Sequence, residues 1–334
     1  MTPIQPIGPQ PAPRAISVIE PVSLALAHVK RVLFQPFDLG KWFVIGFCAW
    51  LAGLGERGGG FHGSGGGNHG HGSPDIRHGL DEARNYLLNN LDWIIPLAVV
   101  IVLFLFALGL LILWLNSRGK FMFLHCVALN RAEVSLPWTQ YSAQGNSLFW
   151  FRLLLGFLGM ILILPLLGII LVLVLRMVYH GAPDAGGILT AVGLGLTFLM
   201  IAFVFGIIQK LTADFVVPIM SLRRCNCLTA WRELAGLICA RFWLFVLYLL
   251  FSLVLAIVIG LIVGALMLVT CCVCCLALLP YIGTVLLLPV LVFERAYSLY
   301  FFAQFGPEYN VFPASPPASP TPGLAPMPVT PSTL

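Results

Sequence analysis

The stretch FWLFVLYLLFSLVLAIVIGLIVGALML, residues 242–268, decides the fold class, because it is long, apolar and free of charged side chains. A helix of about 20 apolar residues crosses a bilayer core of about 30 Å, so this stretch is long enough to span a membrane. The uncharged sequence continues to Phe293. Residues 271–293 therefore predict a second span, joined to the first by a tight turn near Thr270.

The composition of the whole chain agrees with a membrane protein. Hydrophobic residues make up 59% of the 334 residues and charged residues only 9%, whereas charged residues reach about 25% in soluble domains. An ordinary soluble globular protein is thereby excluded. Further apolar stretches predict spans at 39–55, 93–115, 150–175 and 188–209. The expected fold class is an all-α integral membrane bundle of about six transmembrane helices.

Interfacial amphipathic elbow helices are expected to lead into several of these spans. Residues 17–34 form the first, because Ser17 and Glu20 have the spacing of a capping box and apolar residues recur at helical intervals. Two later connections repeat the same residue types 93 positions apart: Arg131, Trp138 and Trp150, then Arg224, Trp231 and Trp243. Trp and basic side chains are typical of helices at headgroup level. The pattern predicts three elbow-and-hairpin units.

Lys and Arg residues are divided unevenly between the two sides of a six-span chain. One side has four of the 18: Arg57, Arg77, Arg84 and Arg176. The side of both termini has the other fourteen: Arg14, Lys30, Arg31, Lys41, Arg118, Lys120, Arg131, Arg152, Lys210, Arg223, Arg224, Arg232, Arg241 and Arg295. Cytoplasmic loops are enriched in basic residues, so we expect both termini in the cytoplasm and the protein in the cytoplasmic (inner) membrane. Basic residues that orient the chain beside a lipid bilayer give no reason to expect nucleic acid as a partner.

The six-span membrane domain is expected to cover residues 17–305, between two Pro-rich ends. Residues 1–16 are predicted to be a flexible arm, and residues 306–334 a disordered cytoplasmic tail that recruits a protein partner. A Gly- and His-rich external loop is expected at 55–92, between the first two spans.

Two clusters of metal-ligating residue types are candidate sites. The external loop contains His62, His69, His71 and His78, and the apolar hairpin contains Cys271, Cys272, Cys274 and Cys275. Nothing in the loop sequence sets a ligand geometry, and cysteines in an apolar hairpin are typical packing residues. Hydrolase, metalloprotease and phosphate-loop motifs are absent from the sequence. We therefore predict no catalytic, cofactor-binding or metal-binding residues, no cofactor and no enzyme activity, while metal binding by either cluster stays an open alternative.

Three sequence features inside or beside the spans predict specific structural roles. Leu164–Gly168 and Leu279–Gly283 share a Pro-x-x-Gly motif, which would suit the broken helices of a transporter with inverted repeats. Asp214 begins an apolar connection, where capping of a helix is its expected role. Ser252, Ala256, Gly260 and Gly264 recur every four residues, which predicts a helix face that packs closely against a neighbouring span.

Five segments resemble an uncharacterised family of bacterial polytopic membrane proteins, and the resemblance extends over about residues 17–310. They are PFDLGKWFVIGFCAWL at 36–51, RGKFMFLHCVALNRAE at 118–133, GNSLFWFRL at 145–153, DFVVPIM at 214–220 and PYIGTVLLLPVLVFERAYSLYFFAQFGPEY at 280–309. The layout is also distantly similar to the membrane domain of some glycerophosphodiester phosphodiesterases. These resemblances imply a membrane location and a helical fold but no activity, because the chain has no segment for the soluble phosphodiesterase barrel.

The sequence favours a non-catalytic structural or accessory membrane component. The alternative from a different class is a small-solute or lipid transporter, and a polar cavity between the third and sixth spans would favour it. Neither the substrate nor the oligomeric state follows from the sequence.

Overall fold

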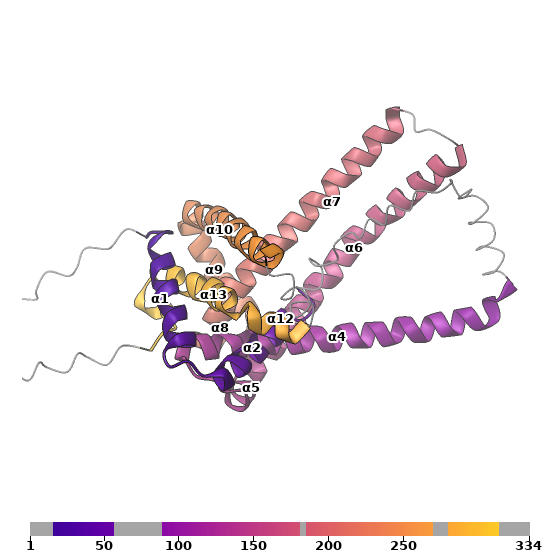
Figure 1. Ribbon diagram of the computed structural model, residues 1–334. Helices are drawn as coiled ribbons and strands as arrows, with labels where there is room; N and C mark the ends of the chain where they lie inside the picture. Colours follow the sequence, from indigo (N-terminus) through magenta and orange to yellow (C-terminus); the bar gives the residue numbers. More distant parts are fainter. Residues whose placement is uncertain (1–15, 57–88, 181–184, 270–279, 314–334) are drawn as a thin grey trace, which may run out of the picture.

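The computed structural model describes residues 16–56, 89–180, 185–269 and 280–313 (Figure 1). The regular structure in these ranges consists of helices. In chain order they are α1 (Glu20–Phe34), α2 (Leu39–Gly53), α4 (Leu91–Leu129), α5 (Ser135–Gln140), α6 (Ser142–His180), α7 (Ala185–Leu211), the π-helix η1 (Thr212–Val216), α8 (Val217–Arg223), α9 (Cys227–Ala240), α10 (Phe242–Val269), α12 (Pro280–Leu286), α13 (Leu288–Ala303) and the 3₁₀ turn η2 (Pro307–Tyr309).

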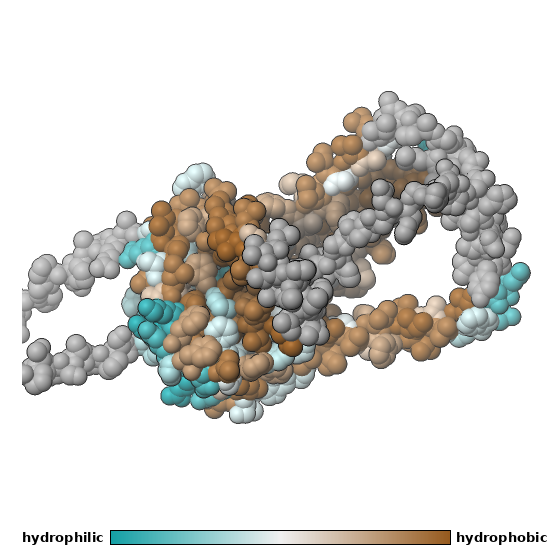
Figure 2. Space-filling view, in the orientation of Figure 1, coloured by the Kyte–Doolittle hydropathy of each residue, from teal (hydrophilic) through white to brown (hydrophobic). Residues whose placement is uncertain are grey.

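Three long helices leave a packed region as apolar arms (Figure 1). We define the arms as residues 92–115 of α4, 153–176 of α6 and 189–207 of α7, and the body as the packed remainder of these helices together with α1, α2, α5, η1, α8, α9, the start of α10 and α13. Most side chains of the arms are large, apolar and exposed, and they give the brown surface that extends from the body in Figure 2. Surfaces of this size and polarity are expected to face lipid.

The length of α4 explains why one helix belongs to both regions. At about 1.5 Å per residue, its 39 residues extend about 58 Å, roughly twice the thickness of a bilayer core. Its first half is apolar up to Leu115, and its second half contains Asn116 and Lys120, which are buried in the body. The second half can therefore pack against protein while the first half faces lipid.

Four helical segments of the described residues are long and apolar enough to cross a membrane, compared with the six spans expected from the sequence. They are Asp92–Leu129, Ser142–Arg176, Leu189–Arg223 and Phe242–Leu266. The first expected span, 39–55, corresponds to α2, which has 15 residues and is shorter than a bilayer core requires. Instead, α2 runs antiparallel along the second half of α4, with Lys41 bonded to Asn130 at one end and Asn116 bonded to Ala52 at the other.

The sixth expected span, 271–293, also differs from the structure. Residues 270–279, including the four-cysteine cluster, lie outside the described residues. The rest of this stretch divides at Leu287 into α12 and α13. Within the expected span, the side chains of Leu288 and Val292 of α13 are completely buried. Farther along α13, Phe215 of η1 packs on the rings of Phe301 and Phe302. This apolar stretch forms part of the core of the body. Hydropathy alone does not distinguish a core helix from a membrane span.

The helix expected within residues 17–34 is present as α1. Ser17 Oγ accepts a hydrogen bond from the Glu20 backbone N–H at 3.3 Å, as one half of a capping box would. The buried face of α1 includes Ala25, His28 and Val32 and packs on α13, whereas Leu26 is exposed. The helix therefore has apolar side chains on two faces, one against the protein and one at its surface.

The two repeated elbows are also present in the structure. Left-handed residues Asn130 and Arg224 end α4 and α8, and the short helices α5 and α9 follow them. In the first elbow, the Arg118 guanidinium lies 4.5 Å from the ring of Trp114 and 4.9 Å from that of Trp138. This stacking of a cation on two indoles suits the headgroup level of a membrane.

Most of the expected packing face of α10 makes no close contact with the described residues. Ser252 is buried, but Ala256, Gly260 and Gly264 are exposed. A Cβ atom added at either glycine would meet no atom within 4 Å. The small side chains therefore permit a close approach that the described part of this chain does not make.

The two ends of the described chain lie together in the body. The Ser17 N–H donates to the Gln304 side chain at 2.7 Å, and the Gln304 amide donates back to the Ser17 carbonyl at 2.9 Å. Residues 306–313, expected to begin a disordered tail, instead place Tyr309 against Phe302 and Phe312 against Tyr300. The remainder of the tail, the arm at 1–15 and most of the Gly- and His-rich loop lie outside the described residues.

Candidate functional site

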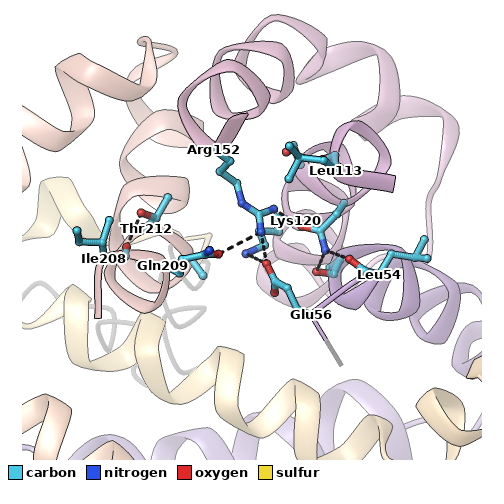
Figure 3. A network of polar contacts seen from close by, with 12 residues as sticks. Leu54, Glu56, Leu113, Lys120, Arg152, Ile208, Gln209 and Thr212 are labelled. Carbon is cyan, nitrogen blue, oxygen red and sulfur yellow. Dashed lines mark hydrogen bonds and ion pairs between the residues drawn. The ribbon is translucent and has the colours of Figure 1, made fainter. Parts of the chain in front are cut away.

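A charged cluster lies where the arms meet the body, and Glu56 is at its centre (Figure 3). Its carboxylate pairs with Lys120 Nζ of α4 at 2.8 Å and with the Arg152 guanidinium of α6. The Lys120 and Arg152 side chains are only 10% and 8% exposed, while that of Glu56 is 39% exposed. The two cations are therefore buried in the body, and the carboxylate is the more solvent-exposed member of the cluster.

Hydrogen bonds hold Arg152 from three directions. Its guanidinium donates to Glu56, to Asn116 Oδ1 of α4 and to Gln209 Oε1 of α7, the last at 3.3 Å. Asn116 is itself fixed, because its Nδ2 donates to the carbonyls of Ala52 and Leu54 at 2.8 and 2.7 Å. The cluster thereby ties α2 and the bases of all three arms together.

Glu56 is in an environment that favours its ionised form. Burial by itself would raise the pKa of its carboxyl, but the charges and hydrogen bonds of Lys120 and Arg152 outweigh burial, so the pKa lies below its usual range. The carboxylate is therefore charged at neutral pH and neutralises part of the buried positive charge.

A second charged group lies in the π-helix η1. Asp214 Oδ2 accepts a hydrogen bond from the Tyr248 hydroxyl of α10 at 2.9 Å and pairs with Lys210 Nζ at 3.0 Å. The side chain was expected to cap a helix, and the structure places it between two helices instead. Single π-helical turns inside α-helices are frequent at functional sites.

The two charged groups border a cavity of about 170 Å³ between α2, α4, the junction of α7 with η1, and α13. Its charged lining residues are Glu56, Lys120, Lys210, Asp214, Glu294 and Arg295. Four parts of the chain that are far apart in sequence thus contribute opposite charges to one cavity, which lies at the level where the apolar arms begin.

Arg295 of α13 is a buried charged residue of this cavity, and some of its hydrogen-bond donors have no acceptor among the described residues. The residue is 9% exposed, and one Nη group donates to the Ala213 carbonyl of η1. Its Nε and second Nη group have no hydrogen-bond partner among the described residues. Buried polar groups are normally paired, and the described part of the chain supplies no partner for these two donors.

The described residues do not include the His and Cys clusters considered from the sequence. His62, His69, His71 and His78 and the cysteines at 271–275 are outside the described residues; within the described ranges, no group of three or more His, Cys, Asp or Glu side chains is placed to hold a metal ion. The helix α6 continues through Pro165 without a break. From the sequence, Lys120, Arg152 and Arg295 were expected only to orient the chain, and Glu56 had no predicted role. The signal for a site was the recurrence of charged residues at the inner ends of the apolar stretches.

An all-helical chain with four helices able to cross a membrane, joined by a charged body at one end, has the architecture of a multi-pass membrane protein. The chain belongs to DUF7544, a family of unknown function, which matches residues 16–288. No curated protein and no solved structure matches it. The expectation of an uncharacterised family is confirmed, whereas a bacterial origin and the likeness to the membrane domain of glycerophosphodiester phosphodiesterases stay predictions.

Proposed function

We propose that this protein is a non-catalytic structural or accessory component of the cytoplasmic (inner) membrane, anchored by its four apolar helices. The observation that carries the proposal is the division between arms and body. The most apolar window in each candidate span is at most 6% buried by the protein, so the arms offer their sides to lipid. The body is held together by its own core and by the cluster around Glu56, and it can present a defined surface beside the membrane.

The proposed orientation places the body in the cytoplasm. Support comes from the described basic residues, since Lys30, Lys120, Arg224 and most others belong to the body, while Arg176 lies at the far end of an arm. An excess of Lys and Arg is characteristic of the cytoplasmic side. Seven prolines lie among small residues after Pro313, and we propose that residues 314–334, the remainder of the expected tail, recruit a protein partner.

Two measurements on the full-length protein test the role. After extraction of membranes with alkaline carbonate, the protein should remain in the pellet; its release would contradict anchoring by the apolar helices. Purified protein in vesicles should cause no uptake of amino acids, sugars or phosphate under an imposed proton or sodium gradient. Gradient-driven uptake would refute the structural role.

A small-solute or lipid permease is the second candidate, and the charged cavity favours it. The cavity lies beside α2, α4 and α13. The paired Pro-x-x-Gly motifs do not support this candidate, because α6 continues through Pro165 and a transporter of this type would have both helices interrupted. Vesicle uptake that is lost in Lys120→Gln, but retained in the surface variant Arg131→Gln, would establish the permease.

A further inference from the structure

The cavity between α2, α4, η1 and α13 contains more buried cationic hydrogen-bonding capacity than its own carboxylates use. Asp214 is occupied by Lys210 and the Tyr248 hydroxyl. Glu56 is occupied by Lys120 and Arg152, so one carboxylate there faces two cations. The third acidic lining residue, Glu294, lies at the exposed side of the cavity.

The guanidinium of Arg295 is therefore the group that a ligand in this cavity would bind. It lines the cavity, nine-tenths of its surface is buried, and its Nε and one Nη group lack partners among the described residues. These two nitrogens lie on the same edge of the planar guanidinium, which is the edge that binds two oxygens of one anion in parallel. Leaving charged donors buried and unpaired is costly, and an oxyanion in the cavity would remove this cost.

The size and position of the cavity limit the class of anion. A volume of about 170 Å³ exceeds the roughly 30 Å³ share of one water molecule in the liquid several-fold, so a group of several heavy atoms fits. The cavity also lies where the apolar arms begin, at the level expected for lipid headgroups. A tetrahedral phosphoryl group is negatively charged, has oxygens that can accept from the two Arg295 nitrogens, and is present in phospholipid headgroups at this level.

We propose that the cavity is a phosphoryl-anion site in which Arg295 binds two phosphoryl oxygens and Lys120 and Lys210 contribute positive charge at its wall. Free phosphate and the headgroup of an anionic phospholipid present the same chemistry. The inference goes beyond the proposed function, because a structural component and a permease can both contain such a site.

Two probes distinguish the sources of the phosphoryl group. Full-length protein in detergent is titrated with inorganic phosphate, and its melting temperature is followed; in parallel, phosphatidic acid and phosphatidylcholine are added and bound lipid is counted by native mass spectrometry. Binding of phosphate alone assigns the site to the free anion, and binding of phosphatidic acid in preference to phosphatidylcholine assigns it to a headgroup. Wild-type protein that binds neither probe would overturn the proposal.

Variants locate the binding. Arg295→Gln should weaken binding of the active probe at least tenfold, and Arg295→Lys, which keeps the charge but loses the two-nitrogen edge, should weaken it several-fold. Arg131→Gln, in which an exposed cation is removed, should bind as the wild type does. Equal binding by Arg295→Gln and wild type would refute the site.

A measurement on the wild-type protein covers the case in which Arg295→Gln does not fold. The bound probe should slow acetylation of Lys210, which lines the cavity, while acetylation of Lys30 on the exposed face of α1 should be unaffected. If acetylation of both lysines is equally insensitive to the probe, the anion does not occupy this cavity and the proposal fails.

Discussion

The Tyr300 hydroxyl of α13 lies 3.2 Å from Nδ1 of His28 on α1, and Nε2 of the same imidazole lies 2.9 Å from the Val127 carbonyl of α4. A neutral ring satisfies both contacts, since Nε2–H donates to the carbonyl and Nδ1 accepts from the hydroxyl. Burial lowers the pKa of His28 and outweighs the opposing effect of the Val127 carbonyl, and the nearby charge of Arg31 lowers the pKa further. His28 thus joins three helices in its uncharged form.

This junction should make the body sensitive to acid. An unfolded histidine takes up a proton below about pH 6.5, whereas folded His28 resists protonation until a lower pH, so acidification through this range favours unfolding. The melting temperature in detergent should fall between about pH 7.5 and pH 5.5, and His28→Gln should lose part of this dependence. Identical pH dependence of the variant and the wild type would show that His28 contributes nothing.

Loss of the Glu56 carboxylate should destabilise the base of the arms. Glu56→Gln leaves Lys120 and Arg152 buried without a counter-charge; because Glu56 is itself partly exposed, we expect a loss of about 1–3 kcal/mol of unfolding free energy rather than the larger cost of a fully buried pair. Glu133→Gln is a matched control, since the Glu133 side chain is also 39% exposed but the guanidinium of Arg131 lies 3.8 Å from its carboxylate. Denaturant unfolding in detergent measures both, and equal losses would contradict a special role for Glu56.

Close packing of α2 on α4 should depend on Gly119. A Cβ atom at this position would lie 2.6 Å from the backbone of Leu51 and Ala52, so Gly119→Ala must push the helices apart and cost about 1–3 kcal/mol. Gly109→Ala, on the arm of the same helix, meets nothing within 4 Å and should be neutral or slightly stabilising. Melting temperatures of the two variants in one detergent test this directly; a harmless Gly119→Ala would rule out the tight contact.

The proposed orientation can be tested by single-cysteine labelling from outside the cell in an otherwise cysteine-free protein. A cysteine at position 66 should be labelled, and cysteines at positions 130 and 320 should be protected, because the last two are proposed to face the cytoplasm. Labelling at 130 with protection at 66 would reverse the orientation.

Local sequence properties were sufficient for most helices. The stretch predicted at 242–268 is α10 at Phe242–Val269, and the repeated Trp and Arg residues marked the elbows that contain α5 and α9. Hydropathy failed for α2 and α13, since apolar residues suit both a lipid-facing helix and the core of a protein. Only burial of residues such as Ile45 and Val292 distinguishes these environments.

The sequence by itself determined that this chain is helical and that its long apolar stretches need lipid or protein to cover them, because helix formation and hydropathy depend on neighbouring residues. The tertiary structure decided which stretches serve the body and which extend as arms. It also brought Arg152 to Glu56, 96 residues away in the chain, and placed Arg295 in the cavity beside η1. Contacts of this kind depend on how distant helices pack, and no local pattern contains that geometry.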